Sequence, residues 1–131
     1  GLVGSIYNHS ATNCTNDIDI TITSLVAPAK SLKGTVGGVI GGVSGEANEC
    51  EFDGLINNGD ITYAGTTQLA NVYFSGIVGK NHDTNSQKDF KVIKNCTNNG
   101  NISSTAESVQ AESLIFSGIS GKDKRSGLHS R

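Results

Sequence analysis

Several features that would point to a specific biochemical activity are missing from this sequence. Its 10 lysines and arginines do not outnumber its 12 aspartates and glutamates, and the net charge is −2. This balance argues against a nucleic-acid-binding surface, which usually carries a clustered basic excess. No segment reaches the roughly 18 consecutive apolar residues that a membrane-spanning helix needs. The sequence therefore predicts neither a nucleic-acid partner nor a membrane span.

Signatures of catalysis and of cofactor binding are missing too. The sequence has no Gly-Xaa-Ser-Xaa-Gly nucleophile motif and no phosphate-binding loop that ends in Gly-Lys-Ser/Thr. The three histidines, His9, His82 and His129, have no repeated counterparts, and we interpret them as solvated loop residues. We therefore expect no catalytic residue, no cofactor and no enzymatic activity.

A metal site is not expected either. The acidic pair Asp17 and Asp19, and the segment Glu46–Asp53, carry oxygen ligands of the kind that Ca²⁺ prefers, but neither follows a known calcium-binding loop. No Cys-Xaa-Xaa-Cys pair is present. Both acidic segments are therefore interpreted as solvated turns.

Helical periodicity is weak throughout the chain. No stretch of a dozen residues carries a sustained i, i+3, i+4 apolar stripe, and 106–114 is the only candidate for one or two helical turns. In contrast, residues 17–23 alternate between polar and apolar side chains, which predicts a strand with Ile18, Ile20 and Ile22 facing the core. We therefore expect an all-β protein.

What the sequence does contain is a repeat. The segment Val72–Lys80 returns with few changes as Leu114–Lys122. Its central motif, Gly-apolar-Xaa-Gly, begins at Gly1, Gly38, Gly76 and Gly118, with steps of 37, 38 and 42 residues. A near-constant period of this length is typical of stacked repeats. We predict a repeat β-solenoid (parallel β-helix) over residues 1–121, with about three units of 37–42 residues and a partial fourth. A polar, basic tail follows at 122–131.

Each full unit also carries a cysteine and a segment rich in asparagine and aspartate. Asn58-Gly59 and Asn99-Gly100 resemble hairpin turns when taken alone, but the period favours coil corners. Side chains at equivalent positions are expected to stack as ladders along the solenoid axis. The expected ladder residues are Asn57 and Asn98; Asp19, Asp60 and Asn101; and Cys14, Cys50 and Cys96.

The cysteines are interpreted as copies of one inward-facing position, with five residues inserted after Cys50. Their odd number argues against a disulfide framework. The chain also has four Asn-Xaa-Ser/Thr sequences, at Asn8, Asn13, Asn95 and Asn101. These are N-glycosylation sites if the source is a eukaryotic secretory pathway, and ladder asparagines otherwise.

The glycine motifs, each followed by the asparagine-rich segment, resemble the GLUG-type (Gly-Leu-Xaa-Gly) repeats of large secreted and cell-surface proteins. Gly1–Gly4 (Gly-Leu-Val-Gly) fits that pattern best. The resemblance implies a β-solenoid within a larger extracellular protein, often an adhesin or a bacterial immunoglobulin-cleaving peptidase whose catalytic part lies elsewhere. No catalytic residue follows from it.

Together these features predict a non-catalytic structural or adhesive segment of an extracellular or cell-surface protein, such as a stalk or filament unit. The expected partners are neighbouring repeats of the same or another copy, stacked head to tail, with glycans or a host surface protein as further candidates. The chain starts within a glycine motif and without a leader, so we expect an excised piece whose ends are uncapped. The alternative is a carbohydrate-binding or carbohydrate-cleaving β-helix, but sugar platforms need exposed aromatics, and the chain has three Tyr, four Phe and no Trp.

Overall fold

The computed structural model describes residues 1–7, 9–23, 33–44, 50–64, 69–81, 92–105 and 111–121. All of the regular structure in these ranges is β-strand, and the strands pair in parallel. The prediction of an all-β solenoid is therefore confirmed. Within the described ranges, no helix is long and apolar enough to cross a membrane.

The chain winds through three coils of five short strands each. The first coil contains β1 (Val3–Tyr7), β2 (Ala11–Thr12), β3 (Thr15–Asn16), β4 (Ile20–Ile22) and β5 (Lys33–Gly37). The second contains β6 (Ile40–Ser44), β7 (Glu51–Asp53), β8 (Ile56–Asn57), β9 (Ile61–Tyr63) and β10 (Leu69–Ser75). The third contains β11 (Val78–Asn81), β12 (Val92–Lys94), β13 (Thr97–Asn98), β14 (Ile102–Ser104) and β15 (Ala111–Ser117). One sequence unit therefore forms one coil.

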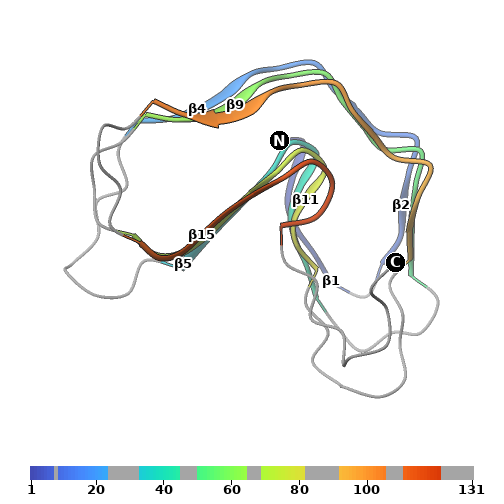
Figure 1. Cartoon of the computed structure of the whole chain (residues 1–131). Helices are drawn as coiled ribbons and strands as arrows, with labels where there is room; N and C mark the ends of the chain where they lie inside the picture. The colour runs from blue at the N-terminus through green and yellow to red at the C-terminus, as the bar shows by residue number, and fades with distance from the viewer. Residues whose placement is uncertain are drawn as a thin grey trace.

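Equivalent strands of successive coils form five parallel sheets of three strands each, such as β4-β9-β14 and β5-β10-β15. Seen along the stack, the coils superimpose (Figure 1): β4 and β9 lie along an outer arch, and the β5 and β1 sheets fold inward beneath it. Because neighbouring strands in a sheet are about 4.8 Å apart, each coil adds about that length to the solenoid.

The stacking continues from the last strand of the third coil into the partial fourth unit. β15 pairs with β10 along its whole length, from Leu69↔Ala111 to Ser75↔Ser117. Beyond β15, Ser120 forms a parallel bridge with Val78. The fourth glycine motif therefore stacks on the third, as the sequence repeat predicts.

The interior has two apolar regions. A cluster of fully and partly buried side chains lies between the β1-β6-β11 and β2-β7-β12 sheets and includes Ile40, Phe52 and Ile77. A second region is aromatic: the Phe74 ring lies 5.6 Å from that of Tyr63 and 5.3 Å from that of Phe116. The second and third coils thus contribute to both regions. Layers stacked in this way let short strands with few large side chains bury a continuous core.

One predicted core residue is exposed. Ile20 and Ile22 lie in β4 and are partly buried, but Ile18 is 70% exposed. The strand begins only at Ile20, because residues 17–19 form a corner between β3 and β4. The alternation of side chains between two faces holds only within a strand, so the prediction that Ile18 faces the core was wrong.

The cysteine column is also different from the prediction. Thr15 and Thr97 both pair with Ile56, which places Leu55, and not Cys50, between Cys14 and Cys96. Cys50 lies before β7 and is buried at another position. The proposed five-residue insertion after Cys50 was therefore wrong, because the chain from β7 to β9 keeps the same register as in the other coils.

Other predicted features fall outside the described residues. They are the loop around Pro28, most of the polar segment after Lys80, Asn8, Glu46, Glu49, His82, His129 and the tail 122–131. The helix candidate at 106–114 is described only from Ala111 onward, where the chain is the strand β15.

Candidate functional site: a corner of stacked polar ladders

The most regular polar feature of the solenoid is the corner between the third and fourth strands of each coil. We call it the polar corner, and it comprises Asn16–Ile20, Asn57–Ile61 and Asn98–Ile102. The three copies recur at a constant separation of 41 residues. Because short parallel strands flank each copy on both sides, each residue of the corner lies beside its counterpart in the neighbouring coil.

The inner ladder of the corner is formed by Asn16, Asn57 and Asn98. Asn57 is fully buried, and its Oδ1 accepts a 2.8 Å hydrogen bond from Asn16 Nδ2. Its own Nδ2 donates to Asn98 Oδ1 at 2.8 Å and to the Gly59 carbonyl at 2.7 Å. Both amide hydrogens and the amide oxygen of Asn57 thus have partners, which is what a buried amide requires.

An outer ladder runs parallel to it on the exposed side. Asn58 Nδ2 donates to Asp17 Oδ1 at 2.7 Å, and Asn99 Nδ2 donates to Asn58 Oδ1 at 2.7 Å. Here the amide groups donate toward the preceding coil, whereas those of the inner ladder donate toward the following coil. The first member of the outer ladder is an aspartate, which as a carboxylate only accepts hydrogen bonds.

A third ladder connects side chains to the backbone. Asp19 Oδ1 accepts a hydrogen bond from the backbone N–H of Asp60 at 2.8 Å, and Asp60 Oδ1 accepts one from that of Asn101 at 2.7 Å. Each carboxylate thus satisfies a donor at the corner of the following coil, where the sheet hydrogen bonds are interrupted. Asp19 and Asp60 therefore have partners within the ladder.

Glycine is required where the corners approach each other closely. A Cβ on Gly59 would lie 2.1 Å from the Ile18 carbonyl oxygen, and one on Gly100 would lie 1.9 Å from the Gly59 carbonyl oxygen. The equivalent residue of the first coil is Ile18, whose side chain is exposed. Asn58-Gly59 and Asn99-Gly100 thus form coil corners and not hairpins, because the strands that flank them belong to different parallel sheets.

The glycine motif meets the inner ladder in the interior. A Cβ on Gly38 would lie 2.4 Å from Asn57 Cγ, and one on Gly76 would lie 2.3 Å from Asn98 Cγ. The glycines therefore allow the inward-folded part of each coil to pack against the buried asparagine column. The two features that define the repeat in the sequence are thus in contact at Gly38 with Asn57 and at Gly76 with Asn98.

A second corner, between the second and third strands of each coil, contains two of the four glycosylation sequences, and its conformation accounts for their asparagines. Asn13 has a φ of 53° and Asn95 a φ of 52°, and the equivalent residue of the middle coil is Gly54, with a φ of 67°. Asparagine and glycine are the residues that adopt this left-handed conformation most readily. Asn13, Asn95 and Asn101 are all exposed, and Asn95 Nδ2 also donates to Asp53 Oδ1 at 2.9 Å.

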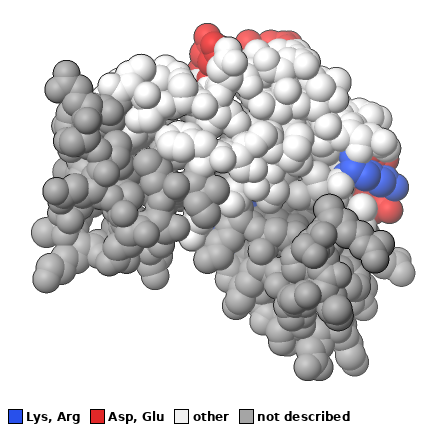
Figure 2. Space-filling view, viewed as in Figure 1, with Lys and Arg blue, Asp and Glu red and all other residues white. Residues whose placement is uncertain are grey.

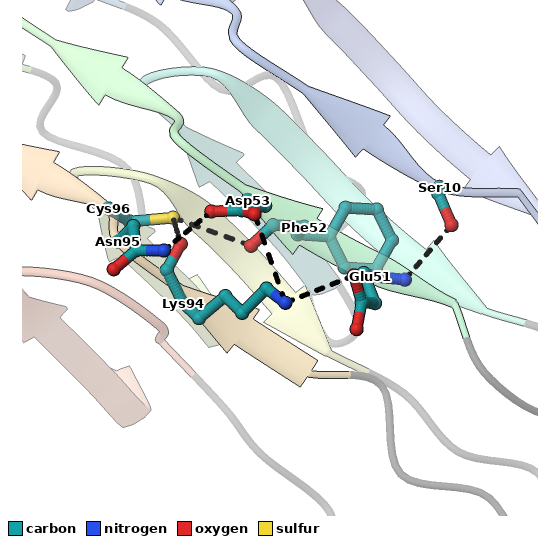
Figure 3. A network of polar contacts seen from close by, with 7 residues as sticks. All are labelled: Ser10, Glu51, Phe52, Asp53, Lys94, Asn95 and Cys96. Atoms are coloured by element: carbon teal, nitrogen blue, oxygen red, sulfur yellow. Dashed lines mark hydrogen bonds and ion pairs between the residues drawn. The ribbon is translucent and has the colours of Figure 1, made fainter.

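The acidic side chains of β7, in the middle coil, lie beside a lysine (Figure 3). Lys94 Nζ is 3.2 Å from Glu51 Oε2 and 3.8 Å from Asp53 Oδ2, with all three side chains partly exposed. On the opposite side, the Glu51 backbone N–H donates to Ser10 Oγ at 2.9 Å. These contacts join adjacent coils, but exposed ion pairs contribute little to stability.

Charge is sparse on the described surface that faces the viewer in Figure 2, where acidic side chains gather at the top and a mixed patch of basic and acidic atoms lies at one side. Among the residues that the structure describes, no group of three or more His, Cys, Asp and Glu side chains could hold a metal ion. His9, the one histidine within the described ranges, is exposed in the first coil.

No family model matches the chain, and neither a curated protein nor a solved structure matches it. The resemblance to GLUG-type repeats therefore stays a prediction. The polar corner itself has a clear chemical character: its amides and carboxylates bind one another between coils. This arrangement joins one layer of the solenoid to the next.

Proposed function

We propose that this chain is a non-catalytic structural or adhesive segment of an extracellular or cell-surface protein, in which it forms part of a longer β-solenoid. The observation that carries the proposal is the C-terminal face of the stack, which consists of the third coil and the fourth glycine motif. This face offers the groups that each earlier coil uses to bind the coil after it. Its partner is accordingly a further solenoid coil.

The apolar columns of the interior end open at this face. Phe74 is fully buried between its neighbours, whereas Phe116, which stacks on it, is 38% exposed. Likewise Ile77 is fully buried and Ile119, in the following layer, is exposed. A further coil would bury the exposed parts of both side chains, which are 38% of Phe116 and 36% of Ile119. Complete burial of a large apolar side chain contributes about 1.5–3 kcal/mol, so each of these would add about 0.5–1 kcal/mol.

The polar groups at this face match a further coil as well. Asn98 Nδ2 donates to the Gly100 carbonyl at 2.9 Å, as Asn57 Nδ2 donates to that of Gly59. In Asn57 the same nitrogen also donates to the asparagine of the next coil. At Gly118 a Cβ would meet nothing within 4 Å, whereas a Cβ on Gly38 would lie 2.1 Å from the Gly76 carbonyl oxygen and one on Gly76 would lie 2.3 Å from that of Gly118. The equivalent space beside Gly118 fits the backbone of another coil.

The stacking role can be tested with a register-matched extension. Residues 80–121 are duplicated directly after Gly121, which is equivalent to Gly79, so that the added unit continues the coil. We expect urea unfolding, followed by far-UV circular dichroism, to show a higher midpoint and a β-sheet signal that grows with chain length. An unchanged midpoint with a lower β-sheet signal per residue would show that the face does not accept a coil.

The extracellular and non-catalytic parts of the proposal need separate measurements. Fractionation of the native source should place the protein outside the cell or on its surface. Its intact mass shows whether Asn13, Asn95 or Asn101 carries sugar, because each glycan adds mass in hexose steps. Release of reducing ends from a polysaccharide by the purified chain would contradict the proposal and favour a carbohydrate-cleaving β-helix.

A further inference from the structure

The two faces of the solenoid differ at the polar corner. We propose that Ile18 and Asp17 close this corner on the N-terminal face, so that the face does not accept the C-terminal face of a second copy in register. The inference rests on the proposed stacking role of the C-terminal face and gives that stacking a direction. The occupant considered is a copy of this chain, placed so that its third coil lies against the first coil shown here.

The first step is steric. Ile18, Gly59 and Gly100 occupy the same position of the corner in the three coils. A Cβ built on Gly59 would lie 2.1 Å from the Ile18 carbonyl oxygen of the coil before, and one on Gly100 would lie 1.9 Å from the Gly59 carbonyl oxygen. By the same register, the Cβ of Ile18 points away from the second coil, and its side chain is 70% exposed. A preceding coil would place its Gly100 carbonyl at about 2 Å from the Ile18 Cβ, well inside van der Waals contact.

The second step concerns hydrogen bonding. In the outer ladder, Asn58 and Asn99 each donate from Nδ2 to the residue of the coil before. Asp17 occupies the same column but has no hydrogen to donate when ionised. A preceding copy would present the Asn99 amide oxygen to the Asp17 carboxylate, so that two acceptors would face each other, which is repulsive.

Two other residues of the first coil, Asn16 and Gly4, are compatible with stacking. Asn16 belongs to the inner ladder. Its amide oxygen can accept a hydrogen bond from a preceding coil, as the amide oxygen of Asn57 accepts one from Asn16. At Gly4 a Cβ would meet nothing within 4 Å, while a Cβ on Gly41 would lie 2.5 Å from the Gly4 carbonyl. At the polar corner the obstacle is thus the dipeptide Asp17-Ile18, which replaces the Asn-Gly of the other two corners.

A tandem chain tests this assignment. Residues 1–117 are placed directly before the full chain, so that Gly1 of the second block follows Ser117 of the first in the place of Gly118, its equivalent in the glycine motif. Substitutions are made only in the second block. With the natural Asp17-Ile18, we expect two solenoids that unfold as independent blocks, with the midpoint of the single chain.

In the double variant Asp17→Asn, Ile18→Gly, we expect one continuous solenoid. Because the junction is then bridged by a stacked corner, the two blocks should unfold in one transition with a higher urea midpoint. The matched control is Asp17→Asn, Ile18→Ala, which removes the apolar side chain but keeps the Cβ. This control should behave like the unsubstituted tandem. Coupled unfolding of the unsubstituted tandem or of the alanine control would overturn the inference, as would uncoupled blocks in the glycine variant.

A second test does not depend on the folding of the tandem. In the chain extended after Gly121, the residue equivalent to Gly100 of the added unit is changed to isoleucine, which reproduces the Ile18 corner. We expect this change to abolish the rise in the unfolding midpoint that the unsubstituted extension gives. If the extension stabilises the chain and the isoleucine variant stabilises it equally, the stacking proposal stands and the blocking role of Ile18 is wrong. If the unsubstituted extension itself fails to stack, the proposed function is wrong.

Discussion

The glycine motif offers a matched pair of substitutions, Gly76→Ala and Gly118→Ala, at equivalent positions of successive units. A Cβ on Gly76 would lie 2.3 Å from Asn98 Cγ and 2.3 Å from the Gly118 carbonyl oxygen, whereas one on Gly118 would meet nothing within 4 Å. Neither glycine has a positive φ. The two substitutions therefore share their chemistry and differ in the space around the new methyl group.

The size of the difference follows from these contacts. Since heavy atoms rarely approach a Cβ within about 3 Å, the Gly76→Ala methyl would have to move the glycine backbone or Asn98 by about 0.7 Å. Overpacking of this kind costs about 1–3 kcal/mol. Displacement of Asn98 would also weaken its hydrogen bond from Asn57, a further cost of about 1 kcal/mol. Alanine lowers the entropy of the unfolded chain, which offsets about 0.4–1 kcal/mol at both positions.

We therefore expect Gly76→Ala to lower the free energy of unfolding by about 1–3.5 kcal/mol, the balance of the overpacking cost, the weakened hydrogen bond and the entropic gain. Gly118→Ala should leave it unchanged or raise it by up to about 1 kcal/mol. Urea unfolding followed by far-UV circular dichroism measures both, with native spectra and equal m-values as controls. Equal effects of the two substitutions would refute the close packing of the glycine motif against the inner ladder.

Three further predictions use the same assay or a simple chemical one. Asn57→Ala should lower the free energy of unfolding by about 3–5 kcal/mol, because it leaves buried hydrogen-bond partners on both sides unsatisfied. Substitution of the exposed Asn58 by alanine should cost less than about 1 kcal/mol. Similar losses for the two would contradict the burial of the inner ladder. Asn95→Ala should destabilise by about 1–2 kcal/mol and Asn95→Gly by less, because of the positive φ, and the reverse order would argue against that conformation. All three cysteines should still react with a thiol reagent after mild oxidation. Cys14 and Cys96 lie two coils apart, about 9–10 Å, which is too far for a disulfide. A disulfide between them would contradict the register.

The constant elements of the fold could be predicted from the sequence because identical residues recur at a fixed separation. The copies of Asn-Xaa-Xaa-Asp/Asn-Ile at Asn16, Asn57 and Asn98 predict a stack, and a stack of coils requires parallel pairing between equivalent strands. The glycine motif supports the same period through Gly76 and Gly118. What the repeat could not reveal is that the two motifs touch, because this contact depends on the inward fold of each coil.

The mistakes arose where local similarity and spatial equivalence differ. The shared cysteine side chain favours an alignment of Cys50 with Cys14 and Cys96. However, Leu55 lies two residues before Asn57, as each of those cysteines lies two residues before its own asparagine. A strict 41-residue alignment would have placed Leu55 in that column and Gly54 beside Asn13 and Asn95. A position in the apolar interior can hold either cysteine or leucine, whereas a position with positive φ admits only a few residue types. The positive-φ column is therefore the more reliable guide to the register.

Ile18 shows a different limit. The alternation of polar and apolar residues along 17–23 predicts a single strand, but the chain turns at 17–19. Alternation determines which way side chains point only within a strand, so it cannot place a residue of a corner. The signal that could have identified this residue is the comparison with its equivalents, Gly59 and Gly100. A Cβ on Gly59 or Gly100 would lie about 2 Å from a carbonyl oxygen of the coil before, whereas the side chain of Ile18 is 70% exposed in this structure.

The central claim is that each sequence unit is one coil, with residues 41 apart in parallel register. Solution NMR tests it most directly through nuclear Overhauser effects around Asn58-Gly59. We predict contacts from the backbone of Ile61 to those of Ile20 and Ile102, and from the Asn57 side-chain amide to Asn16 and Asn98. Contacts that instead pair Asn57 with Asp60 across Asn58-Gly59, in the antiparallel pattern of a hairpin, would contradict the solenoid.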